Sequence, residues 1–331
     1  MQNGVPTPAG VEVTAPARLH LGFLDLNGRL GRRFGSIGLA ISDLRTRIAI
    51  RTAKHTEVGG PESERARQYL ETMQRALALD DAHAVQILEA VPAHAGLGSG
   101  TQLALAIAAG LRRLHNLDPD VEGDATRLGR GMRSGIGIGL FCGGGLVVDG
   151  GRNDQAAPAP IISRLEFPDR WRILVALDPQ RQGVHGTDEV TSFAVLAPMS
   201  DADAADNCRL ILMQALPALA RRDLAGFGSA IKELQMRLGD YFAPVQGGSR
   251  FTSPNVAAVL AALDDAGGFG VGQSSWGPTG FAFAPSREEA DRLAGIARRH
   301  SSGAALDIRI CRGLNCGAQI VAHGMRAESG H

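Results

Sequence analysis

Residues 91–111, VPAHAGLGSGTQLALAIAAGL, mark the fold of this chain most clearly. A short apolar run breaks into a glycine-rich turn at Gly96, Gly98 and Gly100, and then continues as a helix of small residues from about residue 101 to 114. Glycines let the turn pack closely and aim several N–H groups at one point, and the helix that follows adds the positive end of its dipole. This arrangement indicates a phosphate-binding turn.

The turn matches neither of two common phosphate-binding patterns. It lacks the lysine and the spacing of G-x-x-x-x-G-K-[ST], and it is not G-x-G-x-x-G after a strand. A glycine turn before a helix is also commonly just a turn. Ser99 and Thr101 favour binding, because hydroxyls at a helix start can cap the helix or bind a phosphate oxygen or a metal. We count Gln102, the next residue, among the predicted binding residues.

Length and charge limit the classes of protein. The chain has 331 residues, 44% of them hydrophobic, which is enough for two domains with their own cores. Lysine plus arginine number 34 and aspartate plus glutamate 34, so we expect no nucleic-acid partner. No apolar run approaches the roughly 20 residues that cross a bilayer, and no signal peptide is evident. We therefore expect a cytoplasmic protein with no membrane partner.

The cysteines also favour a cytoplasmic location. They are Cys142, Cys208, Cys311 and Cys316, and they suit reduced thiols better than a disulfide framework. The segment CRGLNC brings the last two near each other. Without a second Cys or His pair it is a weak zinc motif, and two thiols near the end of a strand are the alternative.

Strand and helix patterns are mixed without the regular alternation of a doubly wound sheet, which predicts an α+β fold. We expect strands over residues 11–23 and 36–51, and one helix over 203–222. The segment 133–151 is too rich in glycine to be regular throughout, and we expect it to end in a strand at 146–149. A polar, proline-containing loop follows, and we divide the chain near it into domains of residues 1–165 and 166–331.

A second candidate constellation lies in residues 17–41, ARLHLGFLDLNGRLGRRFGSIGLAI. Polar and charged residues are crowded here between flanks that read as buried strand: Arg18, His20, Asp25, Asn27, Arg32 and Arg33. Such groups are costly to bury unless they are paired or bind something. One interpretation is an Asp25–Arg32 salt bridge that closes a hairpin. The other is an anion and metal site, with Asp25 on Mg²⁺ and arginine on phosphate. His20 alone fits a satisfied strand histidine better than a base.

A third constellation is GVGQSSWGPTGFAF, residues 270–283. Gln273, Ser274, Ser275 and Trp276 stand between glycines where hydrophobic strand residues are expected. A loop of this kind can wrap a ligand with amides and hydroxyls, and Trp276 offers a flat wall for an aromatic ring. The alternative is an ordinary turn in which Trp276 caps the core.

Together these segments resemble a known family. The order of PARLHLG, the turn PAHAGLGS and a C-terminal glycine loop resembles the GHMP superfamily of small-molecule kinases. Five segments in this order are similar, more specifically, to the β-ribofuranosylaminobenzene 5′-phosphate synthases of methanopterin biosynthesis: GLGSGTQLAL, DLNGRLGRRFGSIGLAI, RSGIGIGLF…GGGLVVDGG, QGVHGTDEV and GQSSWGP. The resemblance covers most of the chain.

The resemblance implies both a fold and a reaction. The fold would be an N-terminal domain like the second domain of ribosomal protein S5 and a ferredoxin-like C-terminal domain. The reaction would join phosphoribosyl pyrophosphate to 4-aminobenzoate with loss of pyrophosphate and CO₂, making the enzyme a decarboxylating glycosyltransferase. Mg²⁺ would assist, and neither ATP nor pyridoxal phosphate would be needed. An ATP-dependent kinase of the superfamily is the first alternative, and a non-catalytic binding protein the second.

This reaction assigns roles to the candidates. The departing diphosphate needs cations and amides, for which Arg18, Arg32, the glycine turn and Asp25 through Mg²⁺ are available. Arg133 with Ser134, or His185, would orient the acceptor carboxylate. His185 and Glu189 could handle protons, although each could equally be a surface residue. A homodimer is the default assembly.

The scarcity of lysine agrees with this chemistry. The only lysines are Lys54 and Lys232, and neither lies in a glycine-rich segment, which argues against a Schiff-base mechanism.

Overall fold

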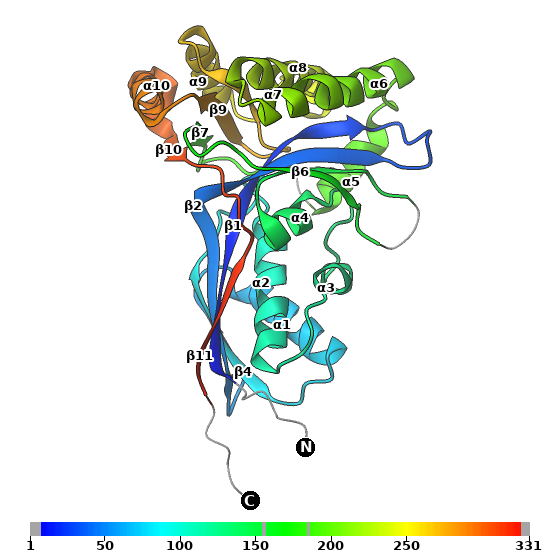
Figure 1. The fold of residues 1–331 in the computed structure, drawn as a ribbon, viewed down its shortest axis with the longest axis vertical. Helices are drawn as coiled ribbons and strands as arrows, with labels where there is room; N and C mark the ends of the chain where they lie inside the picture. Colours follow the sequence, from blue (N-terminus) through cyan, green and yellow to red (C-terminus); the bar gives the residue numbers. More distant parts are fainter. Residues whose placement is uncertain (1–7, 154–156, 184–185, 326–331) are drawn as a thin grey trace, which may run out of the picture.

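The computed structural model describes residues 8–153, 157–183 and 186–325, and the α+β prediction is confirmed. Within these residues the strands form two sheets (Figure 1). The first sheet contains, in spatial order, β11 (Gln319–Met325), β1 (Pro8–Asp25), β2 (Phe34–Ala53), β4 (Ala82–Glu89) and β3 (Glu57–Gly59), with β5 (Leu146–Asp149) beside β2 and β6 (Ile161–Leu165) beside β5. The second contains β10 (Asp307–Cys311), β7 (Arg172–Leu177), β9 (Thr279–Ala284) and β8 (Phe269–Gln273).

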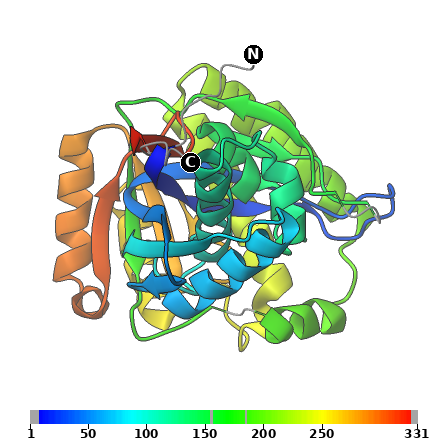
Figure 2. The same cartoon turned by 90° about the horizontal axis from the view of Figure 1, so that it is seen from below.

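The helices fall into two groups. Those of the first half are α1 (Ser63–Ala76), α2 (Ser99–Leu114), α3 (Val121–Arg127) and α4 (Ile136–Gly143). Those of the second half are α5 (Gly186–Val195), α6 (Asp201–Leu210), α7 (Leu216–Ala220), α8 (Leu224–Phe242), α9 (Pro254–Asp265) and α10 (Arg287–Arg299). In Figure 1, α1 to α3 lie beside the lower part of the long hairpin β1–β2 and α6 to α8 cross its upper part. Figure 2 shows α10 and β10 together at one flank.

The long strand β1 takes part in two hydrophobic cores. Its first half alternates, burying Val11 and Val13 in a core shared with α1 and α2. Its second half is buried on both faces, because it contacts α2 and α4 on one hand and α6 and α8 on the other. Leu19 and Leu21 join the core that also contains Phe227 of α8. Register shifts in the pairing with β2 mark this change of environment, after Pro16 and again after His20.

The last strand does not follow the predicted division of the chain. The second sheet begins with β7, after residue 165, but β11 pairs with β1 in the first sheet, with Val13 opposite Ile320. Residues 319–325 therefore belong to the sheet of the first half, whereas the sequence division places them with residues 166–331. Sequence pattern identifies a strand but does not name its partner.

The segment 133–151 is regular only in part, as predicted: residues 136–143 form the helix α4, and the strand β5 follows at Leu146–Asp149. The glycines of α4 permit close packing: a Cβ on Gly137 would lie 3.1 Å from Thr101 Cγ2, and one on Gly139 would lie 2.6 Å from Ile161 Cδ1. The helix predicted over 203–222 is interrupted, because a π-helical turn, Ile211–Ala215, separates α6 from α7.

Within the residues described, no helix combines the length and the apolar character that a bilayer span requires.

Close packing of α2 on the first sheet generates a prediction. A Cβ on Gly110 would lie 2.9 Å from Ile50 Cγ2 and 3.4 Å from Val13 Cγ2. We expect Gly110→Val to lower the free energy of unfolding by about 1–3 kcal/mol, although valine has the better helix propensity. Urea denaturation measures the change, with Arg113→Val at an exposed position of the same helix as the control. Equal effects of the two substitutions would contradict the packing.

Candidate active site

The glycine turn predicted to bind phosphate lies between β4 and α2. Gly96 and Gly98 have φ of 77° and 80°, in the left-handed region that favours glycine. Gly96 is also confined by packing, since a Cβ there would lie 2.2 Å from the Ser274 carbonyl oxygen. Helix α2 starts at Ser99 without a side-chain cap, so its first N–H groups face the space in front of the turn.

Three distant segments are joined at this turn. The Gly96 carbonyl accepts hydrogen bonds from Arg18 Nη1 at 3.0 Å and from Ser274 Oγ at 2.7 Å. Ser274 Oγ in turn accepts the backbone N–H of His20 at 3.0 Å, and the backbone N–H of Arg18 donates to the Leu97 carbonyl at 3.1 Å. Strand β1, the glycine turn and the β8–β9 turn are therefore held against one another.

A cleft of about 570 Å³ opens in front of the turn. Four arginines line it: Arg18, Arg65, Arg130 and Arg133. No carboxylate lines it among the described residues. A cavity with this lining favours an anionic ligand.

Two of these arginines were not predicted from the sequence. A Cβ placed on Gly100 would lie 3.2 Å from Arg130 Nη1, 3.6 Å from the Tyr69 hydroxyl and 3.8 Å from Arg65 Nη1, so these groups converge at the start of α2. The Arg130 guanidinium stacks over the Tyr69 ring at 5.3 Å, and Arg65 pairs with Glu62 at 3.0 Å. Arginine supplies nearly all the basic residues of this chain, so neither position carries a distinguishing sequence signal.

The structure brings most of the predicted binding residues to the cleft. Those that line it are Arg18, His20, Gly96, Gly98, Ser99, Gly100, Thr101, Arg133, Ser134, Ser275 and Trp276. Gln273 lines a smaller pocket that adjoins the cleft. Ser134 also supports the fold, because its hydroxyl donates to the buried Asp149 carboxylate at 3.1 Å.

Two predicted binding residues are buried behind the cleft and do not line it. Gln102 is fully buried and donates from Nε2 to the Gly137 carbonyl at 2.9 Å. Ser274 is fully buried in the junction with Gly96 described above. Both hold neighbouring segments in place.

The turn between β1 and β2 stands apart from the cleft lining. Asp25 Oδ1 accepts the backbone N–H groups of Asn27 at 2.8 Å and Gly28 at 3.1 Å. Arg32 donates to the Gly151 carbonyl at 2.9 Å, and Asn27 donates to Asp201 at 3.0 Å. No ion pair joins Asp25 to Arg32 in the described part of the chain, so the salt-bridge alternative is wrong.

The described residues do not form a metal site. Among them, no group of three or more His, Cys, Asp or Glu side chains is placed to hold an ion. The Asp25 carboxylate is used by its own turn, and no carboxylate of the described residues lines the cleft, so these side chains do not fit a resident magnesium ion. For the zinc alternative, burial raises the pKa of Cys311 to about 12, which favours the thiol over the thiolate ligand.

Two predicted catalytic residues are not placed by the structure. His185 lies outside the described residues. Glu189 falls within α5, and its side chain lies outside the described part.

His20 and Trp276 are the most buried polar side chains of the cleft lining. His20 is 2% exposed. Burial holds the pKa of its imidazole well below the usual range, the charge of Arg18 lowers that pKa further, and a hydrogen bond to its own backbone opposes both. The imidazole is therefore neutral. Trp276 is 3% exposed and stacks on Phe193 at 4.8 Å between ring centroids. One face of the indole ring that was predicted to stack on an aromatic ligand is therefore covered by Phe193.

Sequence profiles of two GHMP domains match the chain. The profile of the GHMP kinases N terminal domain matches residues 64–145, which include the glycine turn, and that of the GHMP kinases C terminal domain matches residues 215–302.

Curated relatives extend over most of the chain. A β-ribofuranosylphenol 5′-phosphate synthase of Archaeoglobus fulgidus is 35% identical over 237 residues, which cover 68% of this chain and 75% of the relative. The protein of the same name from Methanothermobacter thermautotrophicus is 30% identical over 289 residues, covering 80% and 86%. The chain belongs to the β-ribofuranosylphenol 5′-phosphate synthase family. The family predicted from the sequence is thereby confirmed, with phenol in the relatives' names where the prediction has aminobenzene.

Solved structures confirm the predicted GHMP fold. A homoserine kinase from Cytophaga hutchinsonii superposes with a TM-score of 0.65 and 14% identity, covering 95% of this chain and 98% of that one. Mevalonate diphosphate decarboxylase from Staphylococcus aureus superposes with a TM-score of 0.66 and 13% identity, covering 95% and 98%. At these identities the likeness concerns the fold alone.

The convergence of arginines at Gly100 generates a prediction. We expect Arg130→Ala to weaken the binding of inorganic pyrophosphate roughly 10- to 100-fold, because it removes one charged hydrogen-bond donor. Isothermal titration calorimetry measures the affinity, and Arg113→Ala, an exposed arginine near the other end of α2, is the matched control. Unchanged affinity in Arg130→Ala would place the anion elsewhere.

Proposed function

We propose that this protein transfers ribose 5-phosphate from phosphoribosyl pyrophosphate to a 4-substituted benzoate, releasing diphosphate and CO₂. The observation that carries the proposal is the cleft at the start of α2, lined by four arginines and by no carboxylate among the described residues. Membership of a family whose curated relatives are named as ribosylphenol phosphate synthases supports the reaction type.

The first requirement is to stabilise the leaving diphosphate. Arg65, Arg130 and the N-terminal amides of α2 converge near Gly100, where negative charge develops as the bond from ribose C1 to the diphosphate oxygen breaks. The diphosphate keeps the electron pair of that bond. Arg65 is held by its ion pair with Glu62 and Arg130 by its stacking on Tyr69 before the substrate binds, so little reorganisation accompanies the step.

The second requirement is a carbon nucleophile. The ring carbon that bears the carboxylate attacks ribose C1, and the bond between that carbon and CO₂ then breaks, returning its electrons to the ring. Atoms and electrons balance without an oxidant or a reductant. Arg133, whose guanidinium lies 6.0 Å from the centre of the Phe193 ring, is the proposed partner of the acceptor carboxylate.

The acceptor follows from the relatives' names. A ribosylphenol product requires 4-hydroxybenzoate, whereas the sequence resemblance implies 4-aminobenzoate. Both react at the carbon para to an electron-donating group, so both are substrates of the proposed chemistry. We propose 4-hydroxybenzoate as the preferred acceptor.

The cofactor proposals rest on the lining of the cleft. Neither lysine lines it, and Lys232 is bound to Asp264 at 2.6 Å, which supports a reaction without pyridoxal phosphate. Because the described side chains do not fit a resident magnesium ion, we propose that Mg²⁺ enters bound to the diphosphate, as part of the substrate. We also propose a cytoplasmic location and a homodimer. The four cysteines, which form no disulfide, support the cytoplasmic location.

The kinase alternative has less support. It rests on the shared fold, and the solved kinases and decarboxylases are only 13–18% identical to this chain. The relatives at 30–35% identity carry the synthase name.

The function is tested with carboxyl-labelled 4-hydroxybenzoate, phosphoribosyl pyrophosphate and Mg²⁺, without ATP. We expect labelled CO₂ and diphosphate in equal amounts, each dependent on both substrates. Hydrolysis of ATP in the presence of small alcohols, with no release of labelled CO₂, would instead support the kinase alternative.

Asp25 and Arg32 remain proposed catalytic residues. Phe193 of α5 lies between their turn and the cleft, since its ring contacts Phe34 at 5.6 Å and the Arg133 guanidinium at 6.0 Å. The turn is thus one aromatic ring away from the cleft lining.

We expect Asp25→Asn to lower kcat roughly 10- to 100-fold, the effect of losing one charged interaction, without changing stability, because the amide oxygen can still accept both backbone N–H groups of the turn. Asp201→Asn, which alters an exposed contact of the same turn, is the control. Full turnover in Asp25→Asn would remove Asp25 from the mechanism.

A further inference from the structure

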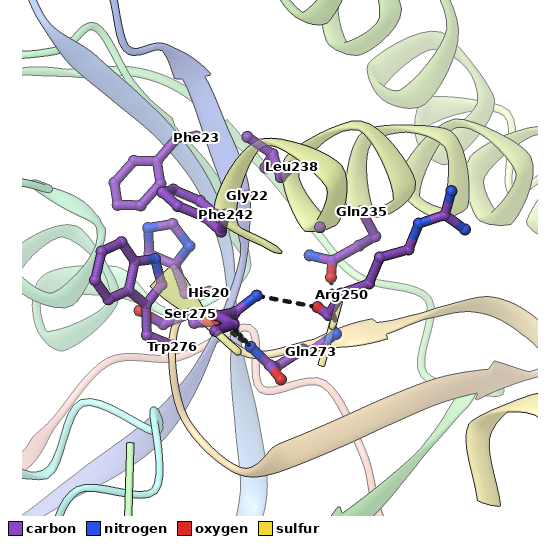
Figure 3. A pocket seen from close by; sticks show the side chains of 12 residues that line it. His20, Gly22, Phe23, Gln235, Leu238, Phe242, Arg250, Gln273, Ser275 and Trp276 are labelled. Atoms are coloured by element: carbon purple, nitrogen blue, oxygen red, sulfur yellow. Dashed lines mark hydrogen bonds between the residues drawn. The ribbon is translucent and has the colours of Figure 1, made fainter. Parts of the chain in front are cut away.

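A small pocket opens beside the cleft (Figure 3). His20, Phe23, Ser275 and Trp276 line both cavities, so the two meet at these residues. The pocket has a volume of about 30 Å³, against about 570 Å³ for the cleft. That exceeds the roughly 10–15 Å³ that one water molecule needs. The pocket can therefore take one small polar substituent of a ligand whose ring lies in the cleft.

Within the described part of the chain, two buried polar atoms at this pocket have no hydrogen-bond partner. They are His20 Nε2 and Trp276 Nε1, on side chains that are 2% and 3% exposed. The glutamines of the same lining are satisfied: Gln235 donates to the Leu21 carbonyl at 2.7 Å, and Gln273 donates to Gln246 at 3.1 Å. A buried polar group without a hydrogen bond destabilises the protein, so two such groups lining one pocket point to a ligand.

The two atoms form a donor and acceptor pair. A neutral imidazole carries one donor and one acceptor nitrogen. The backbone hydrogen bond that opposes the lowering of the His20 pKa favours the proton on the other nitrogen, with Nε2 as the acceptor. The indole Nε1 can only donate. A hydroxyl both donates and accepts, so it satisfies both atoms. An aromatic amine donates to Nε2, but its conjugated nitrogen is a poor acceptor, and a carboxylate cannot donate to Nε2.

Aromatic rings surround the pair. Phe23 lies 4.4 Å from the His20 ring, and Phe242 lies 4.9 Å from the Trp276 ring. In Figure 3, His20, Phe23 and Trp276 lie on one side of the pocket, with Gln235 and Arg250 on the other. An aromatic acid that points its para substituent into the pocket turns its carboxylate-bearing carbon toward the cleft. That is the carbon that must reach ribose C1.

We propose that His20 and Trp276 bind the para hydroxyl of the acceptor, with His20 Nε2 accepting its proton and Trp276 Nε1 donating to its oxygen. The inference rests on the proposed function and assigns to these two residues the preference for a phenol over an aniline. As the ring carbon bonds to ribose C1 and the diphosphate departs, the hydroxyl proton moves to Nε2 and the ring becomes a dienone. Loss of CO₂ restores the aromatic ring as a phenolate, which takes the proton back.

The test compares kcat/KM for 4-hydroxybenzoate and 4-aminobenzoate. We expect the wild-type protein to prefer 4-hydroxybenzoate, and Trp276→Phe to reduce that preference roughly 10-fold, the effect of one hydrogen bond. Trp171→Phe is the matched control, because Trp171 is also 3% exposed but contacts Phe167 and Phe227 away from the pocket. An unchanged preference in Trp276→Phe, or a wild-type preference for 4-aminobenzoate, would overturn the proposal.

The role of His20 has its own readout. We expect His20→Leu to lower kcat for 4-hydroxybenzoate at least 10-fold while pyrophosphate affinity stays unchanged, and His20→Gln to recover part of the loss by supplying an acceptor oxygen. Equal activity of His20→Leu and the wild-type protein would overturn the role of His20.

A binding experiment separates this inference from the proposed function. If neither acid is turned over, the proposed function is contradicted. Calorimetric binding of both acids in the presence of pyrophosphate then still tests whether the pocket binds the para hydroxyl. Tighter binding of 4-hydroxybenzoate that is lost in Trp276→Phe would support the inference. Equal affinities of the two acids for the wild-type protein would overturn it.

Discussion

The arrangement of the site depends on the carbonyl group of Gly96. It accepts hydrogen bonds from Arg18 of β1 and from Ser274 of the β8–β9 turn, and Ser274 also binds the backbone N–H of His20. This one oxygen thereby holds together residues 78 and 178 positions apart in the chain. The left-handed conformation of Gly96 exposes this oxygen, and the absence of a side chain lets the Ser274 backbone approach.

Two environments meet at this junction. On the side of α2 the lining is cationic and suits a diphosphate, with Arg65 and Arg130 near the first turn of the helix. On the side of β8 and α8 the lining is aromatic and suits a ring, with Trp276 between Phe193 and Phe242. A reaction that joins a phosphorylated sugar to an aromatic acid needs both environments in contact, and the Gly96 junction is where they touch.

Sequence patterns predicted the elements of the fold better than their partners. The glycine turn and α2 were predicted because a turn and a helix are local, and the α+β class follows from the mixture of patterns. The pairing of β11 with β1 and the packing of α4 through its glycines depend on residues distant in the chain, so periodicity could not reveal them.

The candidate site shows the same limit. Arg18, His20 and Trp276 stand in unusual sequence surroundings, and the fold places all three in the lining of the cleft. Arg65 and Arg130 lie in ordinary helical and loop sequence, and only the fold brings them to Gly100. Ser274 and Gln102 carry the same polar signal as their neighbours, but the fold uses them to hold the backbone.

The central claim is that the cleft at Gly96 holds the diphosphate that is displaced. A crystal structure of the protein with bound phosphoribosyl pyrophosphate tests it most directly. The account predicts diphosphate oxygens within about 3 Å of the Arg130 guanidinium and of the first N–H groups of α2. Diphosphate bound instead at the β1–β2 turn, on Arg29, Arg32 and Arg33, would contradict it.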